Sequence, residues 1–199
     1  MRYGGRLNRI EFTALIDQRA NRIRASAAAL PLYGMAGWSG PCRIGAWTWD
    51  EDRLVHAGLT FGDPAAGGGW VEVVTTAGPP LPLLIDMRVA AVMPQPPEDR
   101  KTYERNLRAA STPAPHRVGI TVDGVPKPFQ RWPDQQVTAG QRGWLAVLDE
   151  VPGLLLRVSN LAPAEIRLAR VGDLEPHLVG TRTQLLAGYD DHAEDPAPT

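Results

Sequence analysis

The chain has 199 residues, of which 43% are hydrophobic and 22% are charged, and its formal net charge is -1 at pH 7. A chain of this length and composition can bury a sizeable core, which excludes a disordered or fibrous protein. The charge provides no field that would attract nucleic acid or anionic lipid, and no apolar stretch is long enough to span a membrane. The single cysteine, Cys42, excludes an internal disulfide and is typical of a reducing compartment. We therefore expect a cytoplasmic protein that binds neither nucleic acid nor a membrane.

Residues 1–42 are predicted to form an N-terminal helix followed by a glycine-rich link. From Ile10 to Leu30 the apolar residues recur at the spacing of one helix face, which predicts a helix over about 8–30. Pro31 ends this helix, because proline cannot continue a helical hydrogen-bond ladder. The link that follows contains three regularly spaced glycines, Gly34, Gly37 and Gly40.

Three short blocks of the remaining chain recur in the same order, each with the same pattern of apolar and polar positions. The recurrence predicts two copies of one antiparallel β-rich unit, each about four strands and a helix, related by a pseudo-twofold axis. The fold class that we expect is therefore α+β, with an internal duplication flanked by an N-terminal helix and C-terminal helices. The corresponding blocks are 43–50 with 117–123, 69–74 with 143–148, and 87–89 with 156–158.

The first predicted repeat covers residues 43–110. Its β-branched and aromatic residues favour four strands, which are separated by turns rich in glycine and proline. A helix over about 97–110 follows, with proline at its start and acidic residues in its first turn. The four expected strands are 43–49, 54–61, 69–76 and 83–92.

The proline-rich segment 111–116 separates this unit from the second repeat, which covers 117–188. Because Pro126 and Pro128 cannot donate to a strand ladder, we expect the strand over 125–132 to lie at a sheet edge. The acidic, proline-containing tail at 189–199 is expected to be disordered. The other elements expected here are strands at 117–123, 136–149 and 153–159 and helices at 163–171 and 174–187.

Repeat one carries acids and large aromatic residues where repeat two carries only aliphatic ones. Glu72 stands where repeat two has Ala146, and Asp86 stands where it has Leu155. If this face borders a cavity, the tryptophans would stack on a ligand and the carboxylates would orient it. Alternatively, the face meets solvent or the N-terminal helix. The candidate binding residues in repeat one are Trp47, Trp49, His56, Glu72, Asp86 and Arg88.

Recognised catalytic and metal-binding motifs are weak in this sequence. Cys42 has no local signature of a nucleophile, and the four histidines lack the spacing of a zinc site. The glycines at 67–69 lead into a strand and lack the lysine of a phosphate-binding loop. A carboxylate pair formed by Glu72 and Asp86 on adjacent strands is left open. We expect no metal and no cofactor.

We interpret the chain as a non-catalytic protein-interaction module of the scaffold, accessory, chaperone-like or immunity type. It would bind another protein through the tryptophan-bearing face, or through Phe129 and Trp132 on the expected edge strand. A second copy of the chain is the other partner considered. The alternative is a small hydrolase or small-ligand-binding protein with its site in repeat one. A carboxylate whose pKa is raised by an apolar pocket would favour this alternative.

Overall fold

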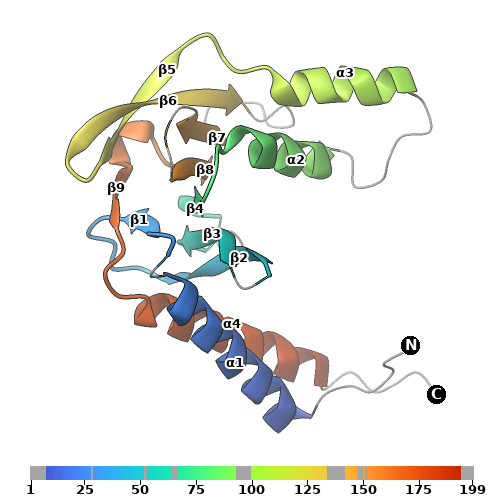
Figure 1. Ribbon diagram of the computed structural model, residues 1–199, viewed down its shortest axis with the longest axis vertical. Coiled ribbons are helices and arrows are strands. Elements are labelled where there is room, and N and C mark those ends of the chain that lie inside the picture. The colour runs from blue at the N-terminus through green and yellow to red at the C-terminus, as the bar shows by residue number, and fades with distance from the viewer. Residues whose placement is uncertain are drawn as a thin grey trace.

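The computed structural model describes residues 8–27, 29–51, 53–63, 67–92, 100–133, 142–147, 150 and 152–193 (Figure 1). Its helices are α1 (Arg9–Ala27), α2 (Leu81–Val92), α3 (Arg100–Ser111) and α4 (Glu175–Ala193), with a short 3-10 turn at Pro163–Glu165. Its strands are β1 (Tyr33–Met35), β2 (Cys42–Asp50), β3 (Arg53–Phe61), β4 (Trp70–Thr76), β5 (Arg117–Val122), β6 (Val125–Pro133), β7 (Arg142–Val147), β8 (Gly153–Ser159) and β9 (Arg167–Arg170). The α+β class is confirmed. No helix in this part of the chain is long and apolar enough to cross a membrane.

The described strands form one sheet of nine strands in the order β1-β9-β5-β6-β7-β8-β4-β3-β2. Two antiparallel runs, β2-β3-β4 and β5-β6-β7-β8, are joined where β4 pairs with β8. The sheet curls, so that β1 at one end contacts β3 and β4. There the backbone N–H of Tyr33 donates to Thr75 Oγ1 at 3.1 Å. One sheet therefore runs through both predicted repeats.

The main core lies on the inner face of this curl. Successive residues of a strand point to opposite faces, so one set of alternate positions on each strand is buried together. Ile23 of α1 and Leu178 of α4 complete this cluster. A smaller cluster on the opposite face packs against Leu84 of α2. We call this opposite face the Glu72 face; its row of directly paired residues is Arg43, Thr60, Glu72, Arg157, Trp144 and Trp132.

Helix α4 lies against β2, the strand at one edge of the sheet. At Gly180 a Cβ atom would lie only 2.0 Å from the carbonyl oxygen of Cys42, so the helix approaches the strand as closely as a glycine permits. The hydroxyl of the next residue, Thr181, accepts a hydrogen bond of 2.7 Å from the backbone N–H of Ile44. The helix thus covers an edge whose backbone groups would otherwise be open to pairing.

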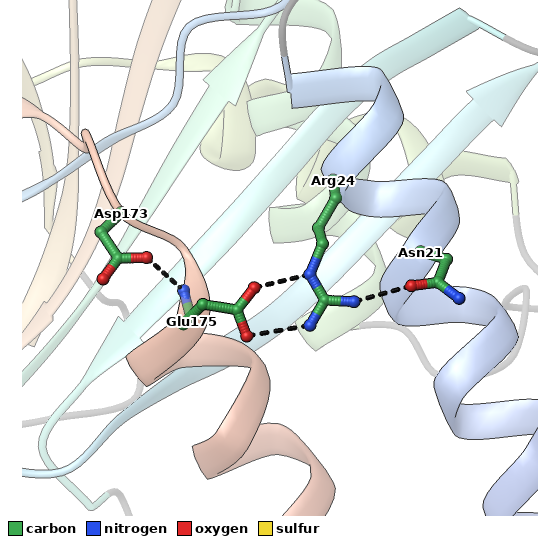
Figure 2. A network of polar contacts seen from close by, with 4 residues as sticks. All are labelled: Asn21, Arg24, Asp173 and Glu175. Atoms are coloured by element: carbon green, nitrogen blue, oxygen red, sulfur yellow. Dashed lines mark hydrogen bonds and ion pairs between the residues drawn. The ribbon is translucent and has the colours of Figure 1, made fainter.

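Helices α1 and α4 lie side by side at the end of the molecule opposite α2 and α3 (Figure 1). Near one end of this pair, Arg24 Nε and Nη2 donate to the two carboxylate oxygens of Glu175 at 2.6 and 2.9 Å (Figure 2). Near the other end, the rings of Phe12 and Tyr189 stack with centroids 4.9 Å apart. Both partners of the ion pair are exposed, so most of the stability of this helix pair comes from apolar packing.

The prediction of a strand over 83–92 is wrong, because this segment belongs to α2. Leu84 and Arg88 are buried and four residues apart, which is a helical spacing, while Asp86 between them is exposed. Leucine, methionine and alanine in this segment are also good helix formers. Residues 87–89 are therefore not equivalent to 156–158, and Asp86 is not equivalent to Leu155.

The pseudo-twofold duplication is not confirmed. Trp70 on β4 and Trp144 on β7 were its expected equivalent pair. Both strands are antiparallel to β8, which lies between them, so they run in the same direction. Both rings also lie on Arg157 of β8 and hence share one face. This pair of strands therefore gives no support to a pseudo-twofold axis.

Two further predictions in the second repeat are wrong. The strand β6 is not an edge strand, because it lies between β5 and β7. Pro126 and Pro128 are nevertheless compatible with this inner position. In the described register β7 pairs only with residues 130–133 of β6, so the two prolines have a paired strand, β5, on one side only. The helix expected over 163–171 is a 3-10 turn followed by β9, whose Leu168 enters the core.

The C-terminal prediction is also corrected in part. Helix α4 continues to Ala193, and Tyr189 packs on α1, so the first residues of the expected disordered tail are helical. Residues 194–199 lie outside the described residues, as do 136–141 and 148–149 of the strand expected over 136–149. The helices expected over 8–30, 97–110 and 174–187 are confirmed as α1, α3 and α4.

Candidate functional site

A cavity of about 400 Å³ lies between α4 and the end of the Glu72 face nearest β2. Its size falls within the range of pockets that hold small ligands. The sheet provides its floor, and α4 provides one wall through Thr181, Gln184 and Leu185. The floor includes the side chains of Arg43, Thr60, Trp70, Glu72 and Arg157.

Strand register places the charged residues of this floor in one line. Arg43 pairs with Thr60, Thr60 pairs with Glu72, and Glu72 pairs with Arg157. Residues that are directly opposite each other on adjacent strands have side chains on the same face. A carboxylate on β4 is therefore flanked by one guanidinium from β8 and, across β3, by another from β2.

Two glycines make room for the Glu72 carboxylate. A Cβ atom on Gly45 would lie 2.7 Å from Glu72 Oε1, and one on Gly58 would lie 3.0 Å from the same oxygen. Glycine inside a strand commonly marks a place where another group approaches the backbone closely. Here the glycines of β2 and β3 let the Glu72 side chain lie flat on the sheet.

Glu72 is half-buried and has neither a hydrogen bond nor an ion pair with any residue that the structure describes. Burial raises the pKa of the Glu72 carboxyl above its usual value of 4.5, and the positive charges of Arg157 and Arg43 oppose this shift. A partly buried carboxylate without a partner costs stability. Its unused hydrogen-bonding capacity is directed to the cavity that it lines.

Arg157 is positioned by two tryptophans. Its Cζ lies 5.3 Å from the ring centroid of Trp70 and 5.4 Å from that of Trp144, which is the range of cation–π contacts. Trp144 is 5% exposed and anchored in the smaller core cluster, whereas Trp70 is half-buried and lines the cavity. The guanidinium is therefore held near the cavity by a rigid aromatic support.

Of the sequence-predicted residues, Glu72 and Trp47 line this cavity, and both are half-buried. Trp49 instead lies under α1, where its Nε1 donates to Ser26 Oγ at 3.1 Å and the guanidinium of Arg22 stacks on its ring. The sequence left open whether this face borders a cavity or meets the N-terminal helix, and Trp49 meets the helix.

His56 is not part of the cavity lining. Its Nε2 lies 3.1 Å from Thr48 Oγ1, and burial lowers the pKa of the imidazole. Asp86 is exposed on α2, so the expected Glu72–Asp86 carboxylate pair on adjacent strands is wrong.

The remaining three sequence-predicted residues are buried in the protein and do not form a binding surface. Arg88 is buried, and its Nε donates to the carbonyl of Ala110 at 2.8 Å, which ties α2 to the end of α3. Phe129 and Trp132 are 0% and 1% exposed, so their side chains are not on an accessible edge. No group of histidine, cysteine and acidic residues that could hold a metal occurs within the described ranges.

Replacing Glu72 with glutamine is expected to stabilise the free protein by about 1 kcal/mol at pH 8, because an uncharged amide removes the cost of a half-buried charge. Since the folded-state pKa is raised, wild-type stability is lost as pH rises through that pKa and recovered below 4.5. The advantage of Glu72→Gln should therefore shrink as the pH approaches 4.5. Urea denaturation of the wild type and the variant from pH 4.5 to 8 measures this advantage. Because His56 and His177 titrate in both proteins, their contributions cancel when the two unfolding free energies are subtracted. A variant that is less stable at pH 8 would contradict this account.

No protein family, no curated protein and no solved structure matches this chain. The function of this chain is therefore inferred from the geometry of the cavity.

Proposed function

We propose that this chain binds a small polar molecule in the cavity between α4 and the Glu72 face. The observation that carries the proposal is the Glu72 carboxylate, which lies on Gly45 and Gly58 with no partner in the described chain and faces a cavity of about 400 Å³. A ligand with a hydrogen-bond donor would supply the missing partner.

The energetics support this interpretation. Burying a polar group without a partner destabilises a protein, so such groups are uncommon outside functional sites. Here the carboxylate lies over Gly45 and Gly58, where a Cβ atom would come within 2.7 and 3.0 Å of Glu72 Oε1. The loss of stability in the free protein is then offset when the ligand binds.

The interpretation that the sequence favoured, a protein-interaction module, stays a prediction. Several of the residues expected to contact a partner protein are covered, so this interpretation has less support than ligand binding in the cavity. Trp49 is covered by α1, and Phe129 and Trp132 are buried in the two core clusters. The aromatic surface that a partner protein would contact is therefore smaller than the sequence suggests.

A fragment screen by thermal shift tests the proposal. Polar fragments are screened against the wild type, against Glu72→Gln and against Asp86→Asn, which changes an exposed acid on α2 in the same manner. At roughly ten times its Kd, a ligand should raise the Tm of the wild type by about 3–6 °C. We expect hits that also shift Asp86→Asn but not Glu72→Gln. A screen without hits, or hits that shift all three proteins equally, would show that the cavity is not the site.

A further inference from the structure

The charges that line the cavity are unbalanced. The cationic side chains in its described lining are Arg43 and Arg157, and the anionic one is Glu72. With the carboxylate ionised the lining is positive, and it becomes more so when Glu72 is protonated. A positively charged cavity favours an anionic ligand.

The two guanidinium groups lie on either side of Glu72. Their strands are three strand spacings apart, which is roughly 14 Å between backbones. An arginine side chain is long enough to extend over an adjacent strand, and both guanidinium groups act on the Glu72 carboxyl electrostatically. They can therefore converge on one anionic group above the middle of the floor.

Neither Arg43 nor Arg157 forms an ion pair with another described residue. Arg157 contacts the rings of Trp70 and Trp144, and these contacts use no hydrogen-bond acceptor. The planar N–H fork of each guanidinium thus stays available, and its geometry matches the two oxygens of a carboxylate.

Glu72 sets the second requirement on the ligand. An ionised carboxylate accepts hydrogen bonds and repels a second anion, so it needs a donor such as a hydroxyl or amine. The ring of Trp70 in the same cavity provides an apolar surface for a planar group. A dianionic phosphate would satisfy the arginines but would bring two negative charges, where a carboxylate brings one, close to the Glu72 charge.

We propose that the ligand is a small organic acid, whose carboxylate is bound between Arg43 and Arg157 and whose hydroxyl or amino group donates to Glu72. This inference depends on the proposed function and narrows it to one class of compound.

Four probes of related shape test it by isothermal titration calorimetry: 4-hydroxybenzoate, benzoate, 4-hydroxybenzamide and inorganic phosphate. We expect 4-hydroxybenzoate to bind most tightly. Removing its hydroxyl should weaken binding about 3–10-fold, and replacing its carboxylate with the neutral amide should weaken it at least 10-fold.

Two arginine variants locate the anion. Arg43→Gln should weaken 4-hydroxybenzoate binding about 10-fold and leave the amide unchanged. Arg53→Gln, which changes an exposed arginine on β3 outside the cavity, should change neither. Because the amide serves as an internal control, a folding defect in Arg43→Gln would weaken both probes and be recognised.

Three outcomes would overturn the inference. If the amide binds as tightly as the acid, the ligand is not an acid, although the cavity still binds ligands. If phosphate binds more tightly than 4-hydroxybenzoate and depends on Arg43, the cavity is a phosphate site. If no probe binds at about 10 mM, the organic-acid assignment is wrong, and the fragment screen alone decides the proposed function.

Discussion

Replacing Gly180 with alanine is expected to lower the free energy of unfolding by about 2–3 kcal/mol. The added Cβ would lie 2.0 Å from the carbonyl oxygen of Cys42 and 3.1 Å from its carbonyl carbon, and backbone atoms cannot move aside as a flexible side chain can. Helix α4 would have to move away from β2, which would also break the hydrogen bond between Ile44 and Thr181. Urea denaturation followed by tryptophan fluorescence measures the loss.

Gly188 provides a matched control on the same helix. Among the described residues, and apart from its own helix backbone and chain neighbours, no atom lies within 4 Å of the position that its Cβ would occupy. Gly188→Ala should therefore raise stability by about 0.5–1 kcal/mol, because alanine is the better helix former. Similar effects at both positions would mean that α4 does not approach β2 as closely as described, and the cavity wall would then be misplaced.

Replacing Trp144 with alanine is expected to cost about 3–5 kcal/mol, which is typical of a large side chain removed from a core. The ring is 5% exposed and packs with Leu84, Ala146 and Leu155 in the smaller cluster. Its removal would leave a void beneath α2 and would take one of the two aromatic supports from Arg157.

Trp70 is the matched comparison, because it contacts the same guanidinium from the other side of β8. It is only half-buried and lines the cavity, so Trp70→Ala should cost about 1 kcal/mol. Denaturant unfolding of both variants tests the difference. Equal losses would mean that the two tryptophans occupy equivalent environments, as the predicted duplication requires.

The sequence predicted the strands well over 54–61, 69–76 and 153–159, which are short apolar segments bounded by turn residues. It failed at 83–92 because Asp86 and Arg88 alternate with apolar residues as they would in a strand, whereas the buried residues Leu84 and Arg88 have a helical spacing. It also missed β9, whose four residues are too few to show a period. The recurrence of three short blocks does not establish a duplication, and one of these blocks, 87–89, lies in a helix.

The candidate site could be predicted only in part. Glu72 was identified because it interrupts an apolar pattern, and single glycines at 45 and 58 inside predicted strands could have indicated a close approach to the backbone. Arg43 and Arg157 were not identified as binding residues. Arg157 joins Glu72 through the pairing of β4 with β8, which is distant in sequence, and Arg43 joins it only through the exact registers of β2 with β3 and of β3 with β4. The position of α4 over β2 depends on tertiary packing, which local patterns do not contain.

Titration of Glu72 measures whether it is a half-buried carboxylate without a protein partner. The ¹³C resonance of its side-chain carboxyl, identified by its absence in Glu72→Gln, is followed by NMR as the pH of the free protein is varied. We predict a midpoint above the usual 4.5, because burial outweighs the two arginines. A midpoint at or below 4.5 would show a solvated or ion-paired carboxylate and would contradict both the cavity's role and the ligand class derived from it.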